Sequence, residues 1–242
     1  MCSSQTKKIQ LACLFANFTD SQLMSIKSVF LVSLLIFQAC FSSYATASNA
    51  PVTGESKKIL IVGDSLSAGY GIEVKDSWPA LMQQQLLQEN LSYKIHNASI
   101  SGQTSAEGVA QIDRLLSLAK PSLVVLELGA NDGLRGLSIK AMQKNLQTMI
   151  TKSQQAGAKV LLVGIRTPVN YGRRYGEMFE ASFQELAKKN NLELIPFMLQ
   201  PLANIVTEDN RKDYIQGDGL HPTAKAQPLI MNFIYPKVKK LL

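Results

Sequence analysis

The sequence is poor in two reactive residue types. Its three cysteines are Cys2, Cys13 and Cys40, and its only histidines are His96 and His221. All three cysteines precede the mature chain that we predict below, so a disulfide framework and thiol catalysis are excluded there. A metal-dependent phosphoesterase needs a cluster of carboxylates and imidazoles around its metal. This chain has two histidines, and one of them lies inside a predicted strand, so we expect no metal site.

Nucleotide-binding motifs and internal repeats are also absent. Neither G-x-x-x-x-G-K-[ST] nor G-x-G-x-x-G occurs, so a flavodoxin-like nucleotide binder lacks its phosphate cradle. The tail lysines Lys237, Lys239 and Lys240 alternate with apolar residues and are not interleaved with aromatic ones. That spacing is typical of the solvated face of a helix, and we expect no nucleic-acid partner.

The first 47 residues have the three parts of a secretory signal. Met24–Lys27 is a short basic start, Ser28–Phe37 is an apolar run too short to span a bilayer, and Ala45–Ala47 is a small-residue cleavage site. We therefore predict removal of residues 1–47 and a periplasmic or secreted protein. A second interpretation, a lipoprotein anchored at Cys40 in "IFQAC", is less well supported by its flanking residues.

The net charge of the mature chain does not identify its binding partners. Losing three lysines and one aspartate with the leader changes the net charge from +7 to +5. Mild basicity suits transient contact with anionic membranes or acidic substrates, and an ordinary solvated surface has the same composition. Residues 48–56 form a short polar lead-in, and we expect one domain at 57–242 that acts as a monomer.

That domain alternates strand and helix patterns. Apolar runs predict five strands, at 57–62, 93–98, 122–128, 158–165 and 192–196. Helical patterns separate or follow them, at 76–90, 104–118, 139–155, about 177–189 and about 222–241. This alternation predicts an α/β fold with a five-stranded parallel sheet covered on both faces.

Functional groups of such sheets gather at the carboxyl ends of the strands. Ser65 stands there, in "ILIVGDSLSAGYG", where a helical turn would aim backbone N–H groups at developing negative charge. The surrounding residues are not the G-x-S-x-G elbow, and Ser67 is a rival nucleophile. A simpler interpretation is that the serine caps the next helix.

The scarce histidine His221 closes "GDGLHP", three residues after Asp218. A tight turn with this spacing brings the carboxylate to one imidazole nitrogen and leaves the other nitrogen free as a base, although the same residues also suit a helix cap. Gly102 in "ASISGQTS" and Asn131 in "GAND" supply donors for an oxyanion, together with the Ser65 N–H. His96 is more simply a packed or half-exposed strand residue.

Five blocks make the resemblance to a known family specific: "GDSLSAGYG", "NASISGQTS", "ELGANDGLRG", "YGRRY" and "GDGLHP". They resemble the SGNH (GDSL) hydrolases, and most closely the bacterial periplasmic thioesterase I, lysophospholipase or arylesterase branch. The resemblance covers nearly all of 57–242. It implies a three-layer flavodoxin-like fold without metal or organic cofactor. It also implies a triad of Ser65, Asp218 and His221, with an oxyanion hole of Ser65, Gly102 and Asn131.

The resemblance implies hydrolysis of esters or thioesters of lipid-like substrates. One departure is Ala130, where the branch commonly has a second glycine. For the substrate groove we expect four residues from the loops beside the nucleophile: Leu134, Pro168, Tyr171 and Met178. Two alternatives remain: a carbohydrate O-deacetylase of the same superfamily and a non-catalytic envelope binding protein. Asp64 and Asp132 are expected to hold their turns through backbone N–H groups.

Overall fold

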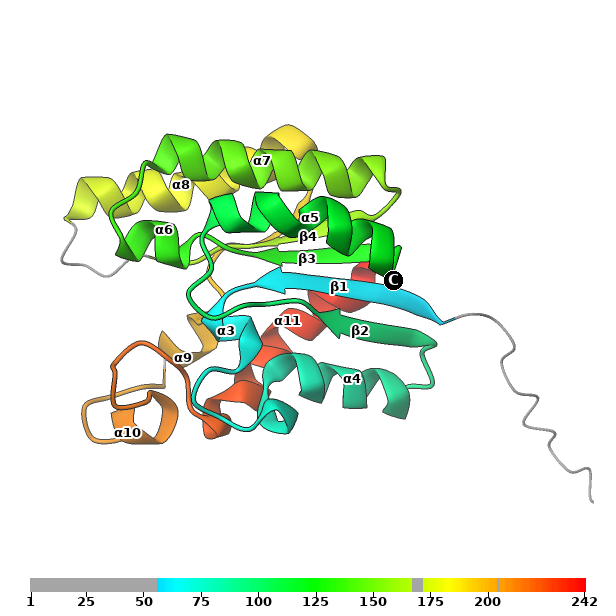
Figure 1. The fold of residues 1–242 in the computed structure, drawn as a ribbon. Coiled ribbons are helices and arrows are strands. Elements are labelled where there is room, and N and C mark those ends of the chain that lie inside the picture. Colours follow the sequence, from blue (N-terminus) through cyan, green and yellow to red (C-terminus); the bar gives the residue numbers. More distant parts are fainter. Residues whose placement is uncertain (1–55, 167–171, 204) are drawn as a thin grey trace, which may run out of the picture. The chain divides into compact units, whose positions relative to one another are not determined.

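The computed structural model describes residues 56–166, 172–203 and 205–242. Its centre is a five-stranded sheet in the order β2-β1-β3-β4-β5, in which every neighbouring pair is parallel (Figure 1). The strands are β1 (Lys57–Gly63), β2 (Tyr93–Asn97), β3 (Leu123–Glu127), β4 (Lys159–Val163) and β5 (Glu193–Ile195). The α/β class, the five strands and the parallel sheet are therefore confirmed.

Position in the sheet explains the composition of the strands. The run from Ile59 to Val62 and the whole of β3 are buried, because helices cover both faces of these central strands. Ile61 pairs with Val125 in the register between β1 and β3. The edge strand β2 is half-buried to exposed along its length, which explains its polar sequence YKIHN. His96 is exposed there, as expected for a strand residue without a catalytic partner.

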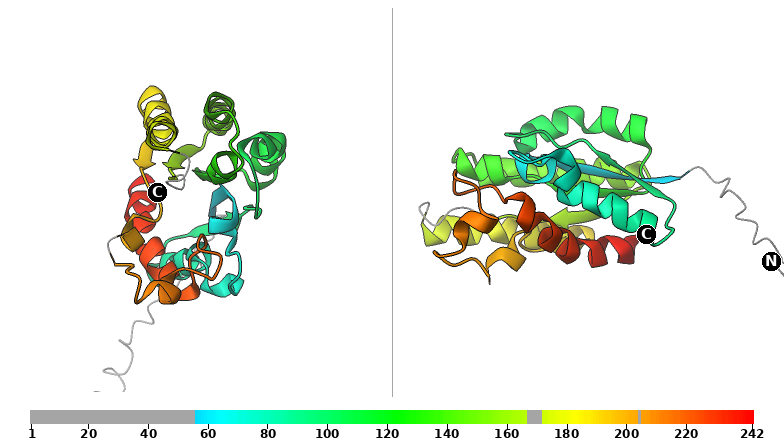
Figure 2. Two further views of the ribbon diagram at one scale, coloured as in Figure 1. Left: turned by 90° about the vertical axis from the view of Figure 1, so that its left-hand side faces the viewer. Right: turned by 90° about the horizontal axis from the view of Figure 1, so that it is seen from below.

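The helices form a layer on each side of the sheet (Figure 2). One layer contains α5 (Ser105–Ala119), α7 (Ile139–Gln155) and α8 (Arg173–Asn190), and the other contains α4 (Trp78–Gln88) and α11 (Gln227–Leu241). The largest fully buried side chains include Trp78 of α4 and Phe179 and Phe183 of α8. These layers confirm the three-layer arrangement that the family resemblance implies.

Local signals explain several helix ends. Thr104 caps α5 in a capping box, because its side chain accepts the Glu107 N–H while the Glu107 carboxylate accepts the Thr104 N–H. Pro79 lies in the first turn of α4, where its missing N–H has no intrahelical role.

Two helix starts were predicted wrongly. Helix α8 begins at Arg173 rather than near Glu177, directly after its N-cap Gly172, which has a φ of +83°. Helix α11 begins at Gln227 rather than near Pro222, because Pro222 is extended and pairs with Ile215 in an isolated bridge. The short helices α6 (Ala130–Leu134), α9 (Gln200–Ala203) and α10 (Arg211–Tyr214) have too few residues to show helical periodicity.

Strand order determines where a site can form. The chain passes from β1 to the edge strand β2 and then returns past β1 to β3, so the order reverses between β1 and β3. At such a switch point the loops after the two strands diverge to opposite faces and leave a crevice at the carboxyl ends. Among the described residues, no helix combines the length and hydrophobicity that crossing a membrane requires.

Close packing beyond β4 generates a stability prediction. A Cβ added to Gly164 would lie 2.4 Å from the carbonyl oxygen of Pro196, which is backbone and cannot rotate away. We expect Gly164→Ala to lower the free energy of unfolding by about 1–3 kcal/mol, as overpacking does. Urea denaturation measures the change. Gly217→Ala is the control, because a Cβ there meets open space; equal stability of the two variants would contradict the prediction.

Candidate active site

The nucleophile candidate Ser65 begins the one-turn helix α3 (Ser65–Ala68) at the carboxyl end of β1. Asp64 is the N-cap of this turn, and its Oδ1 accepts the Leu66 N–H at 3.0 Å. The expected role of Asp64 in holding the turn is thus confirmed. Ser65 is half-buried, and its own N–H has no hydrogen-bond partner among the described residues.

The loop that ends with His221 brings its imidazole to this serine. His221 Nε2 lies 2.8 Å from Ser65 Oγ, and His221 Nδ1 lies 2.6 Å from Asp218 Oδ2. Asp218 Oδ1 also accepts the N–H groups of Leu220 and His221, at 2.9 and 3.1 Å. The Leu220 N–H and the His221 imidazole lower the pKa of Asp218 to about 2, so its carboxylate is charged at neutral pH.

The two remaining oxyanion candidates lie in loops next to Ser65. Gly102 has a φ of +81°, and the Arg135 guanidinium donates to its carbonyl at 2.7 Å while its N–H has no partner among the described residues. The Asn131 Nδ2 donates to Asp64 Oδ2 at 3.2 Å and to the Gln103 carbonyl at 3.1 Å. Ser65, Gly102 and Asn131 all line one cleft.

Ser67, the rival nucleophile, points into the interior. Its side chain is fully buried, and its Oγ donates to Glu127 Oε2 at 2.7 Å. Glu127 ends β3 and is itself fully buried. Ser67 is not among the described residues that line the cleft, and the imidazole of His221 contacts Ser65 instead.

Two buried carboxyl groups lie beneath the turn. Burial raises the pKa of Glu127 well above its ordinary value, and the neighbouring Asp64 raises it further. Burial also raises the pKa of Asp64, to about 6, against the opposing hydrogen bond from the Leu66 N–H. Glu127 Oε1 has no partner among the described residues. The raised pKa favours the protonated form of Glu127, which lies behind Ser67 and Asp64.

The cleft in front of Ser65 has a volume of about 650 Å³, within the range of small-molecule sites. Its described lining comes from the ends of all five strands and from the His221 loop. The apolar members include Tyr70, Leu134, Ile165, Phe197, Leu199, Ile215 and Leu220.

Only one of the four expected groove residues lies among the described residues that line the cleft. Leu134 lines the cleft, as does Ala130, the departure from the family pattern. Met178 does not: it belongs to α8 and is 53% exposed. Pro168 and Tyr171 lie outside the described residues. Sequence reasoning missed Phe197 and Leu199, which follow the short strand β5 and belong to no motif.

Asp132 also differs from expectation. Its carboxylate accepts the Ser105 N–H at 2.8 Å and the Ser105 Oγ at 2.6 Å, so it holds the start of α5 rather than its own turn. Among the described residues, no three His, Cys, Asp or Glu side chains gather as metal ligands would.

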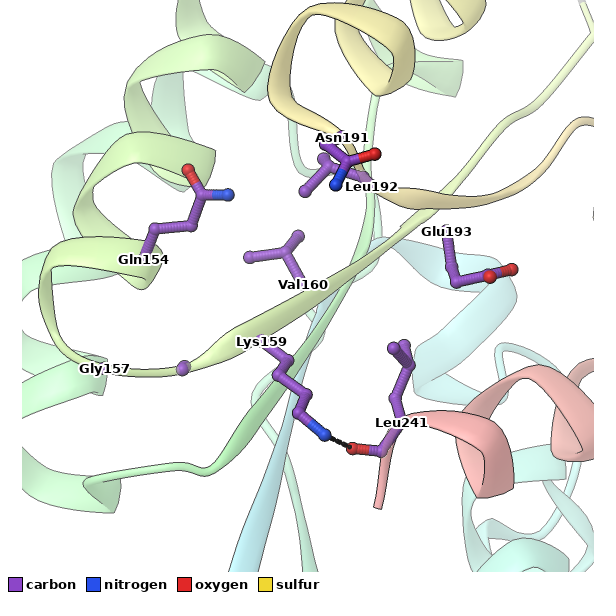
Figure 3. A pocket seen from close by; sticks show the side chains of 9 residues that line it. Gln154, Gly157, Lys159, Val160, Asn191, Leu192, Glu193 and Leu241 are labelled. Atoms are coloured by element: carbon purple, nitrogen blue, oxygen red, sulfur yellow. Dashed lines mark hydrogen bonds between the residues drawn. The ribbon is translucent and has the colours of Figure 1, made fainter.

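A second pocket lies at the amino-terminal edge of the sheet, where β4 and β5 begin (Figure 3). Lys159 points across it and donates to the Leu241 carbonyl at 2.6 Å, and Glu193 also lines it. Glu193 pairs with Lys237 at 3.0 Å and with Lys240. None of its described lining residues is a histidine or a serine, so they do not repeat the arrangement of Ser65 and His221.

Comparison with known proteins agrees with this geometry. Residues 61–228 match the model of the GDSL-like lipase/acylhydrolase family. The arylesterase of Vibrio mimicus is 40% identical over 88% of this chain and 98% of that protein. Thioesterase 1/protease 1/lysophospholipase L1 of Escherichia coli strain K12 is 38% identical over 76% of this chain and 84% of that protein. The crystal structure of TesA superposes with a TM-score of 0.72 at 44% identity, covering 77% of this chain and all of that one.

The fold and the cleft thus define a hydrolase of the three-layer α/β class. The chain belongs to the GDSL-like lipase/acylhydrolase family, and it is an esterase of the SGNH type. Both conclusions confirm the expectations from the five sequence blocks.

The raised pKa of Glu127 generates a pH prediction. Between the ordinary pKa of glutamate and the raised pKa of Glu127, the unfolded chain loses a proton that the folded protein keeps, so stability falls as pH rises. Glu127→Gln removes this loss and keeps an oxygen for Ser67. We expect the free energy of unfolding of the variant, relative to wild type, to increase from pH 5 to pH 8 in urea titrations. Parallel pH profiles would show that Glu127 is charged.

Proposed function

We propose that this protein hydrolyses carboxylic esters and thioesters of lipid-like acyl groups through an acyl-enzyme on Ser65. One observation carries the proposal: the chain of hydrogen bonds from Asp218 through His221 to Ser65 ends in a largely apolar cleft. A binding protein has no need of a serine hydroxyl in contact with an imidazole that a charged carboxylate orients.

In the first half of the reaction, Ser65 Oγ attacks the acyl carbon and its proton passes to His221 Nε2. The bond from the acyl carbon to the leaving oxygen or sulfur then breaks, and His221 returns the proton to the leaving group. In the second half, water attacks the acyl-enzyme with His221 as base, and the acid and free Ser65 are released. Asp218 holds the imidazole and stabilises its charged form.

The oxyanion of each tetrahedral intermediate lies between three donors. The N–H groups of Ser65 and Gly102 are unpaired within the described structure and are ready to bind it. Asn131 supplies its side-chain amide, which turns one N–H from the Gln103 carbonyl toward the oxyanion and keeps its bond to Asp64. Arg135 supports the second donor indirectly, because its bond to the Gly102 carbonyl holds the peptide unit that follows Gly102.

The cleft favours acyl chains over sugars. Its described lining includes residues after β1, β3, β4 and β5 and is mainly apolar. Strands β1 and β5 are three interstrand spacings apart, about 14 Å, a separation that suits a medium-length acyl chain. Lysophospholipids and related lipid esters of the cell envelope combine such a chain with a carboxylic ester, and we assign them as the substrate class.

We further propose that the enzyme is exported and works as a monomer. The leader pattern at 1–47, which lies outside the described residues, supports export. The mild positive charge of the mature chain supports transient contact with anionic lipid surfaces that hold its substrates.

The nucleophile assignment predicts a contrast between two serines. We expect residues 48–242 to hydrolyse p-nitrophenyl esters with a rate that rises from acetate to medium chains. Ser65→Ala should lose nearly all activity, a reduction of the order of 10⁴-fold or more, as in other triads. Ser67→Ala removes a buried hydroxyl outside the cleft and should keep most of the rate.

Each outcome of this series separates the alternatives. Activity confined to acetate would move the assignment to an O-deacetylase. Inactivity of folded wild type on every ester, or full activity of Ser65→Ala, would overturn the mechanism and favour a binding protein.

The oxyanion hole has its own prediction. We expect Asn131→Ala to lower kcat by about 10²–10³-fold with little change in KM, because the lost donor acts on the charge of the transition state. Steady-state kinetics on the best p-nitrophenyl ester measures both constants. Asn145→Ala is the control: it also removes an amide donor, here to Ser105 Oγ, but outside the cleft. A rise in KM with an unchanged kcat would contradict the assignment.

A further inference from the structure

Gln216 connects the two halves of the site, although it belongs to none of the groups considered so far. Its Nε2 donates to the carbonyl of Tyr70 at 2.7 Å and to the carbonyl of Pro222 at 2.9 Å. Tyr70 lies five residues after Ser65, and Pro222 directly follows His221. One side chain therefore joins the nucleophile segment to the histidine loop, across 146 residues of sequence.

The backbone of Gln216 also takes part. Its N–H donates to the His221 carbonyl at 2.8 Å, and its carbonyl accepts the Gly219 N–H at 3.0 Å. These bonds close the loop that carries Asp218 and His221. The side-chain amide is thus fixed to the same loop that it connects to Tyr70.

The fit against the nucleophile segment is close. A Cβ on Gly71 would lie 2.1 Å from Gln216 Oε1, so only a glycine leaves room for the amide. The Tyr70 ring, whose own carbonyl the amide holds, packs on the His221 imidazole with ring centroids 4.5 Å apart. The position of His221 is therefore limited by Gln216 on the backbone side and by Tyr70 on the ring side.

We propose that Gln216 is a positioning residue for the reaction: it holds His221 Nε2 at hydrogen-bond distance from Ser65 Oγ. The inference rests on the proposed function, because it assumes that the proton moves between these two atoms. Gln216 touches neither atom and acts through the two backbone segments that carry them. A misplacement of about 1 Å at a reacting pair costs on the order of 10²-fold in rate.

A matched control exists elsewhere in the chain. Gln83 in α4 also joins separate segments through its amide: Nε2 donates to the Tyr93 carbonyl at 3.2 Å, and Oε1 accepts the Ile95 N–H at 2.7 Å. These bonds lie on the edge strand β2 and not in the cleft. Gln83→Ala therefore removes two bonds between a side-chain amide and the backbone, one donated and one accepted, without reaching His221.

The experiment compares Gln216→Ala with Gln83→Ala and wild type in kcat, KM and thermal midpoint. We expect Gln216→Ala to lower kcat by about 10–10²-fold with KM nearly unchanged. Gln83→Ala should change the thermal midpoint as much as Gln216→Ala does, but it should keep the wild-type kcat. Gln216→Glu, which replaces both donated protons with a carboxylate facing two carbonyl oxygens, should lower kcat at least as far, and it provides the measurement if Gln216→Ala does not fold.

A spectroscopic readout separates positioning from simple destabilisation. The chain has two histidines, so ¹⁵N-histidine labelling yields one reporter at His221 and one at the exposed His96. We expect Gln216→Ala to shift or broaden the His221 Nδ1 and Nε2 signals and leave those of His96 unchanged. Gln83→Ala should leave the His221 signals unchanged.

The experiment distinguishes failure of the positioning role of Gln216 from failure of the proposed function. An inactive wild type, or an active Ser65→Ala, refutes the function before Gln216 is considered. With an active wild type, a kcat of Gln216→Ala within about twofold of wild type overturns the positioning role, as does an equal loss in Gln83→Ala. Unaltered His221 signals, or failure of both Gln216 variants to fold, overturns it as well.

Discussion

The hydrogen bond between His221 Nε2 and Ser65 Oγ joins segments 156 residues apart, and much of the structure serves to keep them together. A single hydrogen bond contributes about 1 kcal/mol net, less than the entropy cost of ordering even a few loop residues. The two loops must therefore be fixed by other contacts. The parallel sheet places β1 at the switch point, and buried Gln227 Oε1 accepts the Trp78 N–H at 3.0 Å across 149 residues. Gln216 adds a second connection close to the reacting atoms.

The same constraint explains the Gly-Asp-Ser order in physical terms. Gly63 is required because a Cβ there would lie 2.8 Å from both Glu127 Oε2 and the Ser67 side chain. Asp64 caps the turn with one oxygen and holds Asn131 with the other, so the nucleophile and an oxyanion donor share one carboxyl group. Burying this group and Glu127 is costly, and the protein limits the cost by raising the pKa of both. Ser65 then follows with its N–H unpaired and its hydroxyl at the cleft.

Sequence reasoning succeeded where the signal is local. Most of the five strands are short apolar runs, and the spacing of Asp218 and His221 lies within one turn, so periodicity and turn chemistry were enough to predict both. It left Ser65 and Ser67 as alternatives, because only the tertiary structure shows that Ser67 faces the buried Glu127. Residues held by long-range contacts carried no local signal.

The same limit applies to the cleft. Phe197 and Leu199 follow a strand of three residues, and neither forms a motif with its neighbours. Met178 was assigned to the groove because it closely follows a loop beside the nucleophile, whereas it lies in α8 and is exposed. Gln216 was not singled out, since its partners lie 146 and six residues away.

The residues that carry the reaction and the residues that shape the cleft belong to different segments of the chain. The blocks that predict the reaction lie after β1, β2 and β3 and in the histidine loop, whereas much of the cleft wall comes from segments after β4 and β5. Arg166 lines that wall with its charge compensated: it pairs with Glu180 at 3.1 Å and lies 4.6 Å over the Phe197 ring. A compensated guanidinium stacked on an aromatic ring presents a more apolar surface than a free one. The wall can therefore change its preference for acyl chains without disturbing the hydrogen bonds at Ser65, because no bond in the triad passes through it.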